Sequence, residues 1–143
     1  MATITRFEDL NIWKEARIQA QGIYAQIINN QNIQDYPLKN QINGSSGSVM
    51  DNIAEGYDRK GNKEFKQFLA IAFGSNGEVK SQYRSLYRCY INQKDFDEFI
   101  KRNENISKML TGFIKYLNRT EFKGTKFIIE EPIAEYTSTN LEH

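Results

Sequence analysis

KEFKQFLAIAFGSNGEVKSQYRSLYRCYI, residues Lys63 to Ile91, is the most regular segment of the sequence. Its apolar and aromatic side chains recur at spacings of three and four, which is the period of one face of an α-helix. The pattern also keeps a seven-residue repeat, which is typical of helices that cross at a shallow angle. The repeat runs through Phe65, Phe68, Leu69, Ala72, Asn76, Val79, Tyr83, Leu86 and Tyr90. We therefore expect one long, half-buried helix here.

The same helical period appears on both sides of this stretch. Further helices are expected from about Phe7 to Asn30, from Pro37 to the DRKGN sequence at residues 58–62, and from Asp95 to Leu117. Proline suits the first turn of a helix, and Asp95 with Glu98 fits a start of the capping-box type, with Asp95 as the N-cap. Four amphipathic helices joined by short connections predict an all-α fold, an antiparallel up-down-up-down four-helix bundle.

The chain of 143 residues is long enough for a single domain with a substantial core. Residues 1–120 are expected to form the bundle. Residues 121–140 show no helical period, and the FIIEE sequence at residues 127–131 leaves two alternatives, an extended arm or a disordered terminus. The final LEH at residues 141–143 resembles the start of a purification tag.

Histidine and cysteine are almost absent from the chain. The single histidine is His143, within the expected tag, so Ser-His and Cys-His nucleophile pairs and most catalytic zinc sites are excluded. The single cysteine, Cys89, has no partner for an internal disulfide and is expected to be a reduced thiol. We therefore expect no metal site, no cofactor and no enzymatic activity.

The chain has no apolar run of the roughly 18 residues that a membrane span requires. The N-terminal sequence MATITRFEDL lacks the basic region and apolar block of a secretory signal. From these two observations we expect a cytoplasmic protein without a membrane partner.

Positive charge is concentrated in the middle of the chain. The net charge is +1, but residues 59–94 contain eight Lys and Arg against two Asp and Glu, a local charge of +6. One interpretation is a phosphate-binding face with Tyr87 and Tyr90 near enough to stack on bases; the other is a solvated flank with the tyrosines in the core. The candidate nucleic-acid contacts are Arg59, Lys63, Lys66, Lys80, Arg84 and Arg88.

Small residues are concentrated in the second predicted helix, in GSSGSVMDNIAEG at residues 44–56. Each glycine costs a helix up to about 1 kcal/mol relative to alanine, so a compensating role is expected. Small side chains allow close approach of a second helix or a second subunit. A phosphate-binding loop is excluded because the sequence has no GxxxxGK[ST] pattern and no preceding strand.

Asn52, Glu55 and Gly56 raise the question of a catalytic site. In projection, Gly56 lies at the centre of the apolar stripe, Asn52 on its flank and Glu55 outside it. We interpret Gly56 as a site of backbone approach, Asn52 as a hydrogen-bonding group and Glu55 as a partner of Arg59 or Lys66. A catalytic pairing of Glu55 with Glu78 is disfavoured, because the hairpin register separates them by about three turns at 5.4 Å each.

Two stretches carry a resemblance to a known family: FEDLNIWKEA at residues 7–16 and SGSVMDNIAEGYDRKGNKEFKQFLAIAFGSNGEV at residues 46–79. They resemble the four-helix-bundle proteins encoded in intervening sequences of bacterial 23S ribosomal RNA, also called the S23 ribosomal protein family. The resemblance extends over about residues 7–118, although Asp51 and the near-neutral charge depart from the common pattern. The matching positions are Phe7, Leu10, Trp13, Asn52, Ile53, Ala54, Glu55, Gly56, Arg59, Phe65, Leu69, Gly74, Ser75 and Glu78.

The resemblance implies a left-handed bundle that assembles as a homopentamer and has no established enzymatic activity. A relative from diversity-generating retroelements uses a similar basic pentamer to bind nucleic acid and a reverse transcriptase. We therefore expect a non-enzymatic oligomer that associates with RNA. The alternative is a protein-protein scaffold ring without a nucleic-acid role. Oligomerisation is also expected from a second apolar flank, formed by Ile12, Ile18, Ile28, Ile71 and Phe73.

Overall fold

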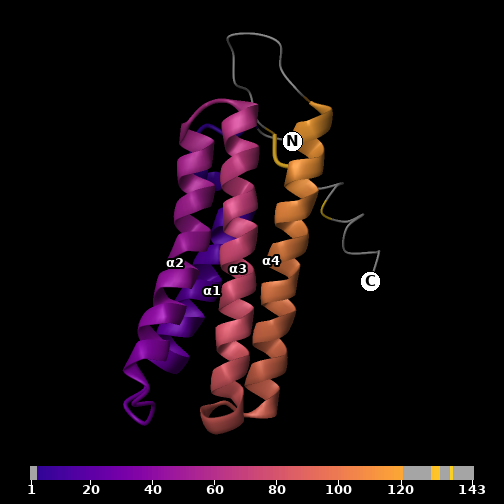
Figure 1. Cartoon of the computed structure of the whole chain (residues 1–143). Coiled ribbons are helices and arrows are strands. Elements are labelled where there is room, and N and C mark those ends of the chain that lie inside the picture. The colour runs from indigo at the N-terminus through magenta and orange to yellow at the C-terminus, as the bar shows by residue number, and fades with distance from the viewer. Residues whose placement is uncertain (1–2, 121–129, 133–135, 137–143) are drawn as a thin grey trace.

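The computed structural model describes residues 3–120, 130–132 and 136, except for the side chains of residues 88 and 89. Four helices pack in chain order into an all-α bundle and run alternately up and down (Figure 1), which confirms the predicted fold. Most of the predicted tail lies outside the described residues. The helices are α1 (Asn11–Ile23), α2 (Tyr36–Asp58), α3 (Asn62–Tyr90) and α4 (Gln93–Arg119).

The first helical segment differs from the single helix predicted between Phe7 and Asn30. A short 3-10 turn, η1 (Phe7–Asp9), is separated from α1 by Leu10, whose backbone is extended at φ −68° and ψ 126°. This break turns the Leu10 side chain into the core, where it is fully buried. At its other end α1 continues into a wider π-helical turn, η2 (Tyr24–Ile28), which keeps both Ile23 and Ile27 buried.

Two polar caps begin α2 and α4. The Asp35 side chain accepts a hydrogen bond from the Leu38 N–H at 3.2 Å, and a proline follows in the first turn of α2. At α4 the predicted N-cap, Asp95, is wrong. Asn92 is the N-cap, because its Oδ1 accepts from the Asp95 N–H at 2.8 Å and its Nδ2 donates to Asp95 Oδ2 at 3.0 Å.

The core is formed by the apolar face of each helix, and α3 supplies most of the heptad positions that the sequence predicts. The prediction is wrong at Tyr90, which is 43% exposed, and Phe68 is only half-buried. Phe65, Leu69, Ala72, Val79 and Leu86 are fully buried. The α2–α3 pair is the most extensive contact between elements, and α1 closes the bundle by packing on both α2 and α4. Shallow packing of this kind is what the seven-residue repeat of α3 favours.

A layer of buried amides interrupts the apolar core and joins three helices. Gln19 Nε2 of α1 donates to Asn76 Oδ1 of α3 at 2.9 Å, and Asn103 Nδ2 of α4 donates to Gln19 Oε1 at 2.8 Å. Asn76 Nδ2 also donates to the Asn103 carbonyl at 2.9 Å and to Ser107 Oγ at 2.7 Å. Because misregistered helices would leave these groups unpaired, the layer favours one register of α1, α3 and α4.

The described part of the C-terminal segment docks on the start of α1. Glu131 is 4% exposed, and its carboxylate accepts hydrogen bonds from the N–H groups of Asn11 at 2.6 Å and Ile12 at 2.9 Å. The Tyr136 hydroxyl donates to the same carboxylate at 2.9 Å, and its ring lies edge-on to Phe113. An acidic side chain therefore caps the N–H groups that the extended Leu10 leaves free.

Candidate nucleic-acid interface

The predicted phosphate contacts lie at both ends of α3 instead of in one compact patch. Arg59, Lys63 and Lys66 lie around the turn between α2 and α3, whereas Lys80 and Arg84 lie towards the other end of α3. At 1.5 Å per residue, Lys63 and Arg84 are about 30 Å apart along the helix. The side chain of the sixth candidate, Arg88, lies outside the described residues.

The cations near the α2–α3 turn are largely engaged with the bundle itself. Arg59 Nη2 donates to Glu55 Oε1 at 2.8 Å, and the Arg59 guanidinium lies 5.2 Å from the centroid of the Phe68 ring. Lys66 Nζ donates to Asn118 Oδ1 of α4 at 3.0 Å. Lys63 is exposed. An exposed ion pair such as Arg59–Glu55 contributes about 0–1 kcal/mol, so the Arg59 guanidinium remains exchangeable towards an external anion.

The cations at the other end of α3 differ in their pairing. Lys80 Nζ lies 3.2 Å from Glu104 Oε1 of α4. Arg84 is exposed, and among the described residues it forms no ion pair. Its guanidinium instead lies 5.6 Å from the centroid of the Phe96 ring. Arg84 is therefore a cation that the described part of the chain leaves uncompensated, next to an aromatic side chain.

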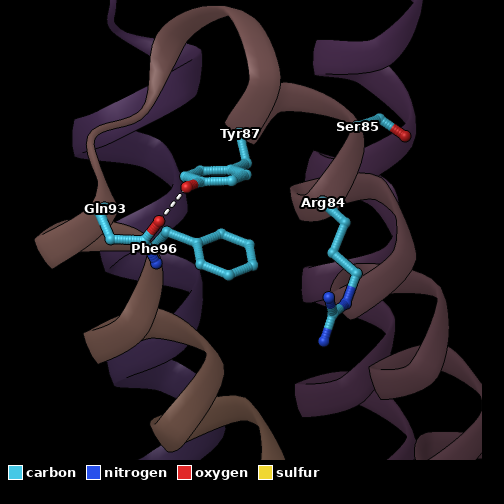
Figure 2. A pocket seen from close by; sticks show the side chains of 5 residues that line it. All are labelled: Arg84, Ser85, Tyr87, Gln93 and Phe96. Carbon is cyan, nitrogen blue, oxygen red and sulfur yellow. Dashed lines mark hydrogen bonds between the residues drawn. The ribbon is translucent and has the colours of Figure 1, made fainter.

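Arg84 lines a surface hollow of about 660 Å³ at the turn between α3 and α4, called here the α3–α4 hollow. Among the described side chains, its other lining residues are Ser85, Tyr87, Gln93 and Phe96. Figure 2 shows the Tyr87 and Phe96 rings on one side and Arg84 across from them, with the Ser85 hydroxyl pointing away. The ring centroids of Tyr87 and Phe96 are 4.1 Å apart, and the Tyr87 hydroxyl donates to Gln93 Oε1.

Two buried aromatic rings, Tyr83 and Phe99, pack behind the Tyr87 and Phe96 side of the hollow. The Tyr83 ring stacks on Phe99 with centroids 3.7 Å apart and on Phe96 at 6.0 Å. The Tyr83 hydroxyl donates to Gln26 Oε1 at 3.0 Å, and burial raises the pKa of Tyr83 far above its usual value. The hydroxyl therefore remains a protonated donor. The Tyr83 ring is held in place by this hydrogen bond to Gln26 and by its stacking on Phe99.

Sequence reasoning identified Arg84 and Tyr87 but missed Gln93 and Phe96. Phe96 belongs to the apolar stripe of α4, and the helical period of that stripe predicts a core position. In the structure its side chain is only half-buried. The two-residue connection between α3 and α4 brings the last turn of one helix against the first turn of the next. The short connection is the feature of the sequence that could have predicted that Tyr87 and Phe96 lie close together.

Gly56, Asn52 and Ser48 of the α2–α3 hairpin have structural contacts. A Cβ atom at Gly56 would lie 2.5 Å from Phe68 Cβ, so the two backbones approach closely there. Asn52 Nδ2 donates to the Ser48 carbonyl at 2.8 Å and to Ser48 Oγ at 2.9 Å. Ser48 Oγ in turn hydrogen-bonds Ser75 Oγ of α3 at 2.9 Å. Asn52, Ser48 and Ser75 thus form a polar connection between the helices.

Glu78 lies apart from Glu55. It is exposed and lines a second hollow of about 410 Å³ together with Gly44, Ser48 and Ser75. Because Ser48 pairs with Ser75 and Gly56 with Phe68, the hairpin register places Glu55 about two turns from this hollow. The two carboxylates therefore do not meet within the chain, and Glu55 is paired with Arg59 instead.

Close helix packing within the bundle does not explain Gly44 and Gly47. A Cβ atom at either position would find nothing within 4 Å, so the prediction of a tight intrachain contact at these two glycines is wrong. The close approach of the two backbones is at Gly56, near the hairpin turn. Further from the turn, Ser48 contacts Ser75 through side-chain hydroxyls, and a Cβ atom at Gly44 or Gly47 would not contact α3. A contact with a second subunit at Gly44 and Gly47 stays a prediction.

Two classes of site are absent from the described part of the chain. It contains no group of three or more His, Cys, Asp and Glu side chains arranged to hold a metal ion. Among the same residues, no helix has both the length and the apolar character needed to cross a bilayer.

Fold and site together define a four-helix-bundle protein with polar connections between its helices and an aromatic, cationic hollow at one end. The chain belongs to the 23S rRNA-intervening sequence protein family, whose model matches residues 8–112. This is a family of helical proteins with no known catalytic activity.

The fold is similar to that of a protein of unknown function from the S23 ribosomal protein family of Bacteroides thetaiotaomicron, solved by crystallography. The TM-score is 0.65 at 24% sequence identity, and the match covers 73% of this chain and 98% of the other. A comparison with curated proteins finds no match. Glu131 and Tyr136, which dock on the start of α1, lie beyond the residues that the family model matches.

Proposed function

We propose that the protein is a non-enzymatic, homo-oligomeric bundle in the cytoplasm that associates with RNA through the cations of α3 and the α2–α3 turn. The observation that carries this proposal is the Arg84 guanidinium, which forms no ion pair among the described residues and lies 5.6 Å from the Phe96 ring in the α3–α4 hollow. Phosphate attracts such a cation, and bases stack on such rings. The 23S ribosomal RNA context in the family's name is consistent with an RNA ligand.

The remaining candidate cations contribute as a distributed positive field. Residues 59–94 carry eight Lys and Arg against two Asp and Glu, so this region is positive although the whole chain is near neutral. Lys63 is exposed, while Arg59 and Lys80 hold surface ion pairs that an external phosphate replaces at little cost. Positive charge at both ends of α3 suits an extended polyanion better than a small anionic ligand.

Homo-oligomerisation is the second part of the proposal. Ile18 of α1 and Ile71 and Phe73 of α3 are 42%, 52% and 46% exposed, so each of these apolar side chains remains available for contact with another subunit. Ile12 does not contribute, because it is fully buried in the bundle core. The pentamer implied by the family resemblance would repeat the α3–α4 hollow five times and raise RNA affinity through multivalency. A sedimentation mass equal to a single chain would refute the oligomer.

RNA retention separates this proposal from its rival, a protein-protein scaffold ring. Tag-free protein is mixed with a labelled RNA pool at about 50 mM salt and passed through a filter that retains protein. The proposal expects retention that decreases steadily as salt rises, since phosphate binding releases counterions. Absence of retention at low salt would leave the scaffold ring, with a protein partner, as the better account.

A further inference from the structure

We propose that the α3–α4 hollow binds an unpaired nucleotide of single-stranded RNA, with its base against Tyr87 and Phe96 and its phosphate at Arg84. This inference rests on the proposed function, since it assumes that the bundle binds RNA. It adds which part of the RNA is recognised, and where.

The shape and lining of the α3–α4 hollow match a nucleotide. Its volume of about 660 Å³ lies within the range of about 300–1,000 Å³ that is typical of small-ligand sites. The two faces differ in chemistry, with the Tyr87 and Phe96 rings on one side and the Arg84 guanidinium on the other (Figure 2). A nucleotide has the same division, an aromatic base joined by a sugar to an anionic phosphate.

The aromatic side of the hollow is held in place before any ligand binds. The Phe96 ring packs against the ring of the buried Tyr83. Tyr83 in turn stacks on the buried Phe99, with ring centroids 3.7 Å apart. Tyr87 is held against Phe96 at 4.1 Å and by its hydroxyl bond to Gln93. Rings that are already ordered lose little entropy on binding a base, and such stacking contributes about 1–3 kcal/mol per base.

The hydrogen bonds around the hollow predict weak discrimination between bases. The Gln93 side chain is the nearest amide, but its Oε1 accepts from Tyr87 and its Nε2 donates to Asp97 Oδ1 at 2.7 Å. Each end of this amide thus already holds one hydrogen bond within the protein, which restrains its orientation towards the edge of a base. Stacking is available to every base, so we expect recognition of unpaired nucleotides with little dependence on sequence.

The same geometry disfavours double-stranded RNA. In a duplex the faces of the bases are covered by their neighbours, so Tyr87 and Phe96 would reach only the backbone. Arg84 would then supply a phosphate contact without any contribution from the rings. Single-stranded RNA therefore gains a stacking contribution that a duplex of the same length lacks.

The test compares the full-length protein with two hollow variants and a matched control. Fluorescence anisotropy measures the binding of a single-stranded RNA of about 12 nucleotides and of a blunt duplex of the same length. Tyr87→Leu and Arg84→Gln are each expected to weaken single-strand binding about tenfold, while Tyr87→Leu leaves duplex binding unchanged. Tyr36→Leu is the control, because Tyr36 is 64% exposed at the start of α2 and does not line the hollow.

A second measurement needs no variant. In the wild-type protein, bound single-stranded RNA is expected to give nuclear Overhauser contacts between base protons and the ring protons of Tyr87. RNA that binds without these contacts, and equally to wild type and Tyr87→Leu, would overturn the nucleotide site while leaving the proposed function standing. A wild-type protein that binds neither RNA would overturn both.

Discussion

Gly56 of α2 lies so close to α3 that a Cβ atom at position 56 would stand 2.5 Å from Phe68 Cβ and 3.1 Å from the Phe65 ring. Phe68 Cβ is fixed to the backbone, so only a displacement of the helices would relieve the clash. We expect Gly56→Ala to lower the free energy of unfolding by about 1–3 kcal/mol, measured by urea denaturation.

Gly22→Ala is the matched control for this substitution. Gly22 is also helical, but a Cβ atom there would find nothing within 4 Å. Alanine is the better helix former, so Gly22→Ala should raise stability by up to about 1 kcal/mol. Equal effects of the two substitutions would show that Gly56 has no role in backbone approach.

The buried amide layer leads to a second prediction. Asn76→Ala removes the acceptor of Gln19 Nε2 and the donor to the Asn103 carbonyl, so buried polar groups on two other helices lose a partner. Each such group costs about 1–3 kcal/mol, and the melting temperature should fall accordingly. Asn43→Ala, at an exposed position of α2, should change it little. A wild-type melting temperature for Asn76→Ala would contradict a stabilising role for this layer.

The capping carboxylate Glu131 makes stability depend on pH. Burial raises the pKa of Glu131, while the N–H groups of Asn11 and Ile12, the Tyr136 hydroxyl and the nearby Lys14 oppose the rise. A carboxyl with a raised folded-state pKa favours folding most below its unfolded value, and this contribution is lost as pH rises. As pH rises above about 4, where the unfolded carboxyl ionises, wild type should therefore lose stability relative to Glu131→Gln.

Thermal denaturation at a series of pH values measures this effect. Glu130→Gln, at the half-buried neighbouring position, serves as the control and should keep the wild-type pH profile. A constant stability difference between wild type and Glu131→Gln across the range would mean that the ionisation of Glu131 is not coupled to docking.

The Glu55–Arg59 pair gives a prediction of small size. Both side chains are about half exposed, and their contact of 2.8 Å joins positions one helical turn apart. Pairs of this kind contribute about 0.3–0.5 kcal/mol, so Glu55→Gln should change unfolding free energy by no more than that, and less at high salt. A loss above about 2 kcal/mol would point to a role for Glu55 beyond this surface pair.

How much of the fold was predictable from sequence depends on the kind of signal. The heptad positions of α3, such as Phe65 and Val79, are buried as predicted because the repeat itself encodes the packing face. The break at Leu10 was not predictable, since it is linked to Glu131, a residue 121 positions further along the chain. The N-cap at Asn92 was missed because Asp95 offers an equally good local pattern one turn later.

The candidate site was only partly predictable for the same reason. Projection onto one helix placed Arg84 on an exposed line, and the structure leaves that guanidinium without a described ion pair. A projection of α3 alone does not show that Phe96 comes from α4 to face it, or that Glu104 engages Lys80. Contacts between helices depend on register and rotation, which the repeat constrains but does not specify.

RNA association through the cations of α3 is measured most directly by the salt dependence of binding. For the tag-free wild-type protein and Arg84→Gln, the logarithm of the binding constant for a single-stranded RNA is measured against the logarithm of salt concentration. We predict a straight decline for wild type, with a slope that becomes shallower by about 0.7 in Arg84→Gln because one phosphate contact is lost. Binding that is absent at about 50 mM salt, or that does not change with salt, would contradict it.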